Sequence, residues 1–213
     1  AGWWGFRHVD KNTEIPAEVF AKIEPITPRA VLVLSSGKQI DLAESHEQIT
    51  EQNGMIVEVD SSGEIRYQRT DLQSEEIIYN KVIVPRSGEY FVTLCDGSKV
   101  WLNADTEFEF PVNFSETIRE VRLKGEAYFE VAPDSLHPFI VKTEQQNLRV
   151  LGTSFAIRAY ANESVILTTL ETGKVNIHSK GQEVILTPGE QSCLKDGNLT
   201  VAKVNTTLFT AWH

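Results

Sequence analysis

The sequence predicts an all-β protein, a jelly-roll-like sandwich or double-stranded β-helix built from short antiparallel strands with little helix. Residues 121–131 alternate with a period of two, so that one face is mostly charged and the other carries Val121, Leu123, Ala127, Phe129 and Val131. Tight-turn signals such as Asp96-Gly97 recur at short intervals along the chain. Residues 34–42 also repeat the pattern of residues 94–102, which is typical of a sandwich assembled from similar hairpins.

The N-terminal part combines one helix pattern with the first strands. Residues 14–23 have a proline near their start and apolar side chains at Val19, Phe20 and Ile23, which is typical of one short helix. From residue 28 onward the pattern favours strands, with a hairpin across residues 31–42. Residues 59–67 form a third, looser copy of this hairpin.

The better-defined strands follow in the second half of the chain. Residues 91–93 and 100–102 flank the Asp96-Gly97 turn, where glycine accepts a positive φ without a steric clash. Gly125 interrupts the apolar face of its strand, at a position where strands commonly bend or bulge. Further strands are predicted at residues 139–142, 148–151, 155–160, 165–170, 174–178, 183–186 and 199–204, each separated by turn signals.

Composition limits the classes of function. The chain has 213 residues, of which 41% are hydrophobic and 23% charged, as expected of a soluble globular protein. Its formal net charge of −10 argues against nucleic-acid binding, which needs clustered lysine and arginine. Solubility alone would also produce such an acidic surface.

Motifs for catalysis, metals and cofactors are missing from the sequence. The five histidines are scattered, without the H-x-H pair of a cupin-type metal site. There is no nucleophile elbow, phosphate-binding loop or dinucleotide motif. Glu126 and Glu130 lie beside Arg122 and Lys124, which favours charge pairing on the sheet surface over acid–base chemistry. We therefore expect neither an enzyme nor a cofactor.

The two cysteines and Trp101 each allow two interpretations. Cys95 and Cys193 would form a disulfide only if their strands are neighbours; otherwise both are buried free thiols. Trp101 and Asn103 point away from Val100 and Leu102. The Trp101 indole is therefore either a stacking platform for sugars or a cover for the second face of the sheet.

The segment DGSKVWLNADTEFEFP, followed by F-x-x-x-x-R-x-V-x-L-x-GEAYFEV, resembles the FecR-type anti-sigma factor family. Further matches keep the order and approximate spacing of the family: PFIV at 138–141, VLGTSF at 150–155, AY at 159–160 and LTPGEQ at 186–191. The positions that carry the motif are Asp96, Gly97, Trp101, Leu102, Asn103, Gly125, Glu126, Phe129, Pro138, Phe139, Gly152 and Phe155.

The resemblance implies a jelly-roll-like β domain and a division of the chain. Residues 1–24 would be a juxtamembrane segment, with an aromatic-then-basic start typical of a membrane interface; the alternative for this start is a short N-terminal strand. Residues 25–75 would supply N-terminal strands, 76–205 the FecR-type domain, and 206–213 the start of a connection to a missing C-terminal domain. The chain would be the periplasmic part of a single-pass inner-membrane protein, whose membrane helix is absent here.

The resemblance also implies partners. An absent cytoplasmic segment would hold an extracytoplasmic-function sigma factor, and the periplasmic region would receive the signalling domain of a TonB-dependent outer-membrane transporter. Nucleic acid is not an expected partner. The alternative, based on aromatic residues and fold class alone, is a carbohydrate-binding jelly-roll module.

Some proteins of this family are described as cutting themselves at the Gly-Thr pair that matches Gly152-Thr153. The Thr153 hydroxyl could attack the preceding carbonyl and shift the peptide to a hydrolysable ester. The alternative is a bend between strands. The family often has asparagine after the motif phenylalanine, whereas this chain has Ala156, which removes one potential polar partner.

Overall fold

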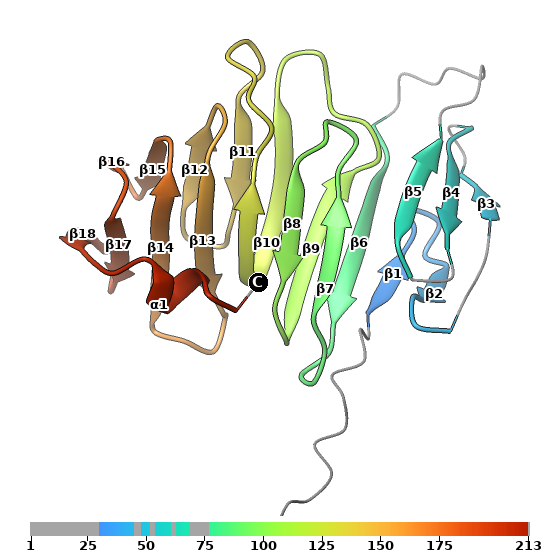
Figure 1. Cartoon of the computed structure of the whole chain (residues 1–213), viewed down its shortest axis with the longest axis horizontal. Helices are drawn as coiled ribbons and strands as arrows, with labels where there is room; N and C mark the ends of the chain where they lie inside the picture. The colour runs from blue at the N-terminus through green and yellow to red at the C-terminus, as the bar shows by residue number, and fades with distance from the viewer. Residues whose placement is uncertain (1–29, 45–47, 52–53, 61–62, 69–76, 213) are drawn as a thin grey trace, which may run out of the picture.

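The computed structural model describes residues 30–44, 48–51, 54–60, 63–68 and 77–212. These residues form short strands and one turn of helix (Figure 1). In chain order the elements are β1 (Val31–Val33), β2 (Gln39–Asp41), β3 (Gln48–Thr50), β4 (Ile56–Val59), β5 (Ile65–Gln68), β6 (Tyr79–Val84), β7 (Tyr90–Thr93), β8 (Lys99–Leu102), β9 (Thr106–Pro111), β10 (Arg119–Glu130), β11 (Phe139–Lys142), β12 (Asn147–Val150), β13 (Ser154–Ala159), β14 (Val165–Thr172), β15 (Val175–Ser179), β16 (Gln182–Leu186), β17 (Glu190–Lys195), β18 (Asn198–Lys203) and α1 (Thr207–Thr210).

Two sheets pack face to face and share one strand. The first sheet has the order β2-β1-β6-β9-β10-β11-β12-β15-β16, and the second has the order β7-β8-β10-β13-β14-β17-β18. A separate sheet, β3-β4-β5, lies at the end of the molecule where the chain enters (Figure 1). The predicted all-β sandwich of short antiparallel strands with little helix is therefore confirmed.

Strand β10 passes from one sheet to the other at Gly125. Residues 119–124 pair with β9 and β11, whereas residues 125–130 pair with β8 and β13. Gly125 has φ +122°, and a Cβ atom there would lie 2.4 Å from the Thr106 Oγ1. Only glycine fits this close approach without rearrangement, so the bend expected at Gly125 transfers the strand between layers.

The chain then places hairpins alternately in the two sheets. The pairs β11–β12 and β15–β16 join the first sheet, and β13–β14 and β17–β18 join the second. The pairing of β10 with β11 is parallel, which the sequence did not predict. It arises because the loop after Val131 returns the chain to the first sheet alongside the start of β10.

A phenylalanine cluster fills the centre of the sandwich. Phe129 stacks on Phe155 at 5.1 Å between ring centroids and meets Phe108 and Phe139 edge-on. All four rings are fully buried. Two of the four, Phe129 and Phe155, come from the second sheet and the other two from the first, so this cluster holds the layers together.

The three predicted hairpin copies have the same turn. The amide N–H groups of Gly37, Gly63 and Gly97 donate to the carbonyl three residues earlier at 2.8, 2.9 and 2.9 Å. The φ angles of these glycines are +82°, +80° and +84°. The shared sequence pattern therefore encodes a shared turn, as predicted.

Two expectations concern residues that the structure does not describe, and others are changed by the strand pairing. The predicted helix at 14–23 and the juxtamembrane segment at 1–24 lie outside the described residues. Strand β17 was not among the strands predicted by residue range, although Cys193 was already expected to lie in a strand. Strand β1 pairs with β2 and β6, so of the described strands before residue 76 only β1 and β2 continue the first sheet. No described helix has the length and apolar character needed to cross a membrane.

Candidate functional site

The Gly152-Thr153 peptide lies where the chain crosses between layers. Strand β12 ends in the first sheet and β13 begins in the second, so residues 151–153 must span the sandwich edge. Gly152 has φ +150°, and a Cβ atom there would lie 2.7 Å from the Cα of Pro133. A side chain at this position would collide with the backbone of the 132–138 loop.

A second segment holds the same peptide from another side. Gly173, in the β14–β15 turn, has φ +88°, and a Cβ atom there would lie 2.8 Å from both the Gly152 carbonyl oxygen and the Thr153 Oγ1. The Thr153 carbonyl accepts the Val131 N–H at 3.0 Å. Two segments that are distant in sequence, 131–133 and the turn at Gly173, therefore fix this one peptide bond.

The Thr153 hydroxyl is buried and already engaged. The side chain is 4% exposed, and its hydroxyl donates to the Lys174 carbonyl at 3.1 Å. Among the described residues, no carboxylate or histidine is hydrogen-bonded to this hydroxyl. The geometry places a nucleophile next to the Gly152 carbonyl, but it provides the hydroxyl with a backbone acceptor instead of a side-chain base.

Beside this peptide the surface is hollowed into a groove of about 440 Å³. We call it the crossover groove, and it is lined by Arg149, Val150, Leu151, Gly152, Thr153, Gly173, Lys174 and Asn176. Its two charged side chains are both cationic and exposed.

Asp96 explains part of the recognised motif as structure. Its carboxylate accepts from the Ser98 hydroxyl and the Arg119 guanidinium, both at 2.7 Å. Arg119 is 4% exposed, lies over the Phe139 ring and donates to the carbonyls of Ala132 and His137. This buried ion pair joins the β7–β8 turn of the second sheet to the start of β10 in the first.

Glu126 is the centre of a second polar cluster. Its Oε2 accepts from the Asn103 amide and the Arg158 guanidinium, both at 2.9 Å. Glu126 and Arg158 face each other on neighbouring strands, so the expected charge pairing across the sheet is confirmed for Glu126. The pKa of Arg158 is raised, chiefly by its hydrogen bond to Glu163. The structure thus brings together Asn103, Gly125 and Glu126 of the motif.

Trp101 is packed into an aromatic group on the outer face of the second sheet. Its ring lies 4.9 Å from that of Phe91 and 5.7 Å from that of Tyr128. Tyr128 was expected on the polar face; it points outward but is buried, and its hydroxyl donates to Glu171. Burial raises the pKa of Tyr128. This packing favours the covering role of Trp101 over the sugar platform.

The two cysteines are far apart in the second sheet. Cys95 lies in the turn after β7, Cys193 lies in β17, and strands β8, β10, β13 and β14 separate them. Both are free thiols in the described structure. The suggested disulfide is therefore not formed, and Cys95 is exposed instead of buried.

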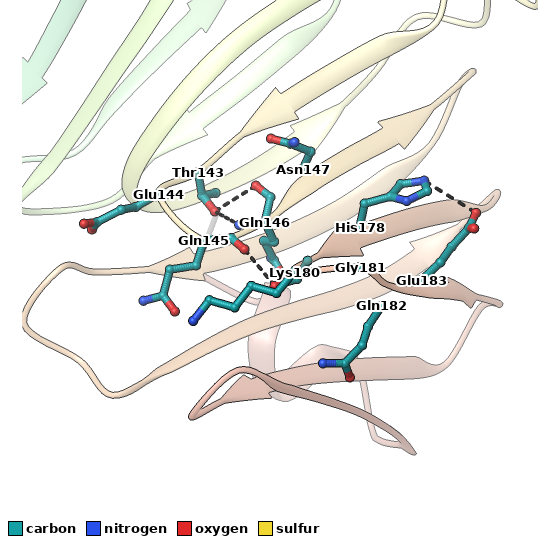
Figure 2. Close-up of a pocket in the computed structure, with 11 residues that line it drawn as sticks. Thr143, Glu144, Gln145, Gln146, Asn147, His178, Lys180, Gly181, Gln182 and Glu183 are labelled. Carbon is teal, nitrogen blue, oxygen red and sulfur yellow. Dashed lines mark hydrogen bonds and ion pairs between the residues drawn. The ribbon is translucent and has the colours of Figure 1, made fainter.

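A polar pocket, which the sequence did not indicate, lies between two turns. Residues 143–147 and 178–183 enclose about 330 Å³ (Figure 2). At its base, buried Gln146 donates to Thr168 at 3.0 Å, but the Gln146 Oε1 has no partner among the described atoms. His178 meets Glu183 at 3.4 Å at the rim. The described residues contain no cluster of potential metal ligands.

Several residues that organise these sites were not singled out from the sequence. Arg119 lies just before the predicted run 121–131, and Arg158 lies within the predicted strand 155–160, where a charge normally points to solvent. The available signal was Arg119 itself, an arginine inside the apolar motif run. Gly173 was marked only as a turn.

The central region of the chain matches a known protein family. The FecR protein family matches residues 81–176, which contain all the motif positions named above. Two crystal structures of a "putative anti-sigma factor" from Parabacteroides distasonis ATCC 8503 are similar. One is 34% identical over 63% of this chain and 64% of that chain, with a TM-score of 0.62. The other is 35% identical over 62% and 63%, with a TM-score of 0.61. The chain thus spans slightly less than two thirds of those proteins. No curated protein matched.

Proposed function

We propose, from the match of residues 81–176 to the FecR protein family, that this chain is the periplasmic regulatory part of a membrane-anchored anti-sigma factor. In this proposal it relays a signal from a TonB-dependent outer-membrane transporter to an extracytoplasmic-function sigma factor. The sigma factor is held by a cytoplasmic segment, and the transporter's signalling domain contacts the periplasmic side.

The observation that carries the proposal is the family match together with 34–35% identity to proteins of the same fold. The site geometry agrees with a regulatory scaffold, because Asp96 and Glu126 use their carboxylates to join strands and sheets. A relay requires that transporter binding favour one conformation, or one cleaved state, over another.

Self-cleavage at Gly152-Thr153 is the finer part of the proposal. Support comes from the positive φ of Gly152 and from the Thr153 hydroxyl beside it. Attack of this oxygen on the Gly152 carbonyl would transfer the acyl group from the Thr153 nitrogen to its oxygen, and water would then cleave the ester. Intact mass after prolonged incubation tests this step. Two fragments, one ending at Gly152 and one beginning at Thr153, would support it, and a single uncleaved species would reject it.

The relay is tested by pull-down of the chain with the purified signalling domain of a TonB-dependent transporter from the same genome, run in parallel with a glycan array. Receptor capture without glycan binding supports the proposal. Glycan binding without receptor contact would replace it with the carbohydrate-binding alternative.

A further inference from the structure

The crossover groove carries a cation without an ion-pair partner. The structure describes the arginines Arg66, Arg86, Arg119, Arg122, Arg149 and Arg158. All except Arg149 have a carboxylate within ion-pair distance among the described residues. Arg149 is exposed at the groove together with Lys174, which also lacks a described ion pair. In a chain of net charge −10, two uncommitted cations at one groove form a local anion-binding surface.

The same groove contains an unused hydrogen-bond acceptor. Asn176 faces Arg149 on the neighbouring strand, and its side-chain nitrogen donates to Glu183 at 2.7 Å. Its side-chain oxygen is buried and has no partner among the described atoms. A buried carbonyl oxygen without a donor is costly, so a bound molecule with an N–H group would satisfy it.

Apolar side chains surround these polar groups. Leu151, at the rim, is 46% exposed. Ile185 follows Asn176 in the same row across the sheet and is 51% exposed. Gly152 and Gly173 leave backbone uncovered at the base of the groove. The groove and its edge therefore present cationic, amide and aliphatic side chains close together.

We propose that the crossover groove binds an acidic, aliphatic segment of a partner protein in extended conformation. A carboxylate of the segment pairs with Arg149, and Lys174 adds to the positive electrostatic potential at the groove. A backbone N–H of the segment donates to the Asn176 oxygen, and an aliphatic side chain packs on Leu151. Arginine suits this role because its planar guanidinium pairs with a carboxylate through two parallel hydrogen bonds.

This site is additional to the proposed relay and does not require cleavage of the chain. A small inorganic anion would use the cations but neither Leu151 nor the Asn176 oxygen. A membrane surface would use the cations and Leu151, but Asp134, whose N–H donates to the Leu151 carbonyl, would bring a carboxylate to the lipid. A peptide segment uses all three kinds of contact.

The test begins with a selection on the whole chain. A phage-displayed random-peptide library is selected against the 213-residue protein and depleted on the Arg149→Glu, Lys174→Glu double variant. We expect the remaining peptides to combine Asp or Glu with Leu, Ile or Val. If no peptides remain, or if they lack acidic residues, the proposal is rejected.

Anisotropy with the selected peptides then measures each contact. We expect Arg149→Glu to weaken binding roughly tenfold or more, and replacement of the peptide's carboxylates by amides to weaken it similarly. The matched control is Lys195→Glu, which makes the same charge change on the other sheet at a lysine without a described ion pair. It should change affinity less than about twofold, because distant exposed charges are screened.

Three results would overturn the site. Equal losses in Arg149→Glu and Lys195→Glu would indicate attraction to net charge alone. Arg149-dependent binding to anionic lipid vesicles without peptide binding would assign the groove to a membrane. Self-association that Arg149→Glu abolishes would assign it to a second copy. Circular dichroism confirms that each variant is folded, and Arg149→Gln replaces Arg149→Glu if the charge reversal disturbs the fold.

Discussion

The chain crosses between the two sheets at Gly125 and again at Gly152, and the crossings are built differently. At Gly125 the strand continues without a break, and each half is paired on both sides. At Gly152 the strands stop, and a three-residue connection crosses beside an open groove. Both crossings use a glycine with positive φ and a buried threonine hydroxyl, Thr106 at the first and Thr153 at the second.

This difference determines how easily each crossing can change its conformation. The first is enclosed by hydrogen-bonded strands, so any movement there would break ladders in both sheets. The second is held by contacts from Pro133 and Gly173, which belong to a loop and a turn. A position held by loops can change with less cost than one held by strands. The second crossing is therefore the better candidate for regulation.

The largest expected effect is at the first crossing. Gly125→Ala would place a Cβ atom 2.4 Å from the Thr106 Oγ1 and 2.7 Å from its Cα, inside a paired region that cannot yield. We expect unfolding in urea to reveal a loss of about 3–5 kcal/mol from backbone strain plus overpacking. The control Gly97→Ala also has a positive φ, +84°, but open space around it, and should lose about 1–2 kcal/mol. Equal losses would contradict the steric explanation.

A smaller effect is expected at the second crossing. Gly152→Ala also meets backbone, at 2.7 Å from the Pro133 Cα, but this partner lies in a loop that can move. We expect a loss of about 2–3 kcal/mol in the same urea experiment. Gly173→Ala presses on the same peptide from another side, so the double variant should lose less than the sum of the single losses. A loss as large as that of Gly125→Ala would mean that the crossings are equally rigid.

The two threonines allow a finer comparison. The Thr106 hydroxyl accepts the Glu126 N–H at 3.0 Å and lies 3.2 Å from the Glu126 carbonyl, whereas the Thr153 hydroxyl makes one bond at 3.1 Å. Substitution by valine should therefore cost about 2 kcal/mol at Thr106 and about 1 kcal/mol at Thr153 in thermal or urea unfolding. Thr153→Val also removes the nucleophile, so any self-cleavage must stop, while Thr153→Ser should retain it.

The smallest expected effect is a loss of local stability at acidic pH. His137 and two backbone N–H groups lower the pKa of Asp134 to about 2, and Asp134 lies next to Pro133 of the second crossing. Because this pKa is below its unfolded value, the stabilising contribution is complete above about pH 4 and is lost as the pH falls towards 2. Amide exchange in residues 151–153 should therefore increase over this range, with little change around Gly125. Asp134→Asn should remove the pH dependence, and an unchanged profile would exclude Asp134 as its source.

Much of this arrangement could be predicted from the sequence. Period-two alternation from Val121 to Val131 and the turn at Asp96-Gly97 depend on local geometry, so they were readable without a structure. The bend at Gly125 was predicted for the same reason. The sequence could not reveal that the bend changes sheets, because this depends on which strands pair with each half of β10.

The candidate sites were harder to predict from the sequence than the fold. Gly152-Thr153 was found through the family resemblance, but the contacts from Pro133 and Gly173 join segments separated by about twenty residues each way and have no local signal. Arg149 looks like any outward charge on a strand, and only the complete set of ion pairs identifies it as uncommitted. The choice between a Cys95–Cys193 disulfide and two free thiols stayed open for a related reason, since strand order cannot be read from strand patterns.

The alternation of hairpins between the two layers makes this scaffold modular. Each hairpin after β10 closes with its own turn and adds to one edge of one layer, so a pair of successive hairpins lengthens both layers together. Relatives could gain or lose such pairs at the β16 and β18 edge without repacking the phenylalanine centre. The extent of both layers would then be adjusted by counting hairpins, while the crossings stay unchanged.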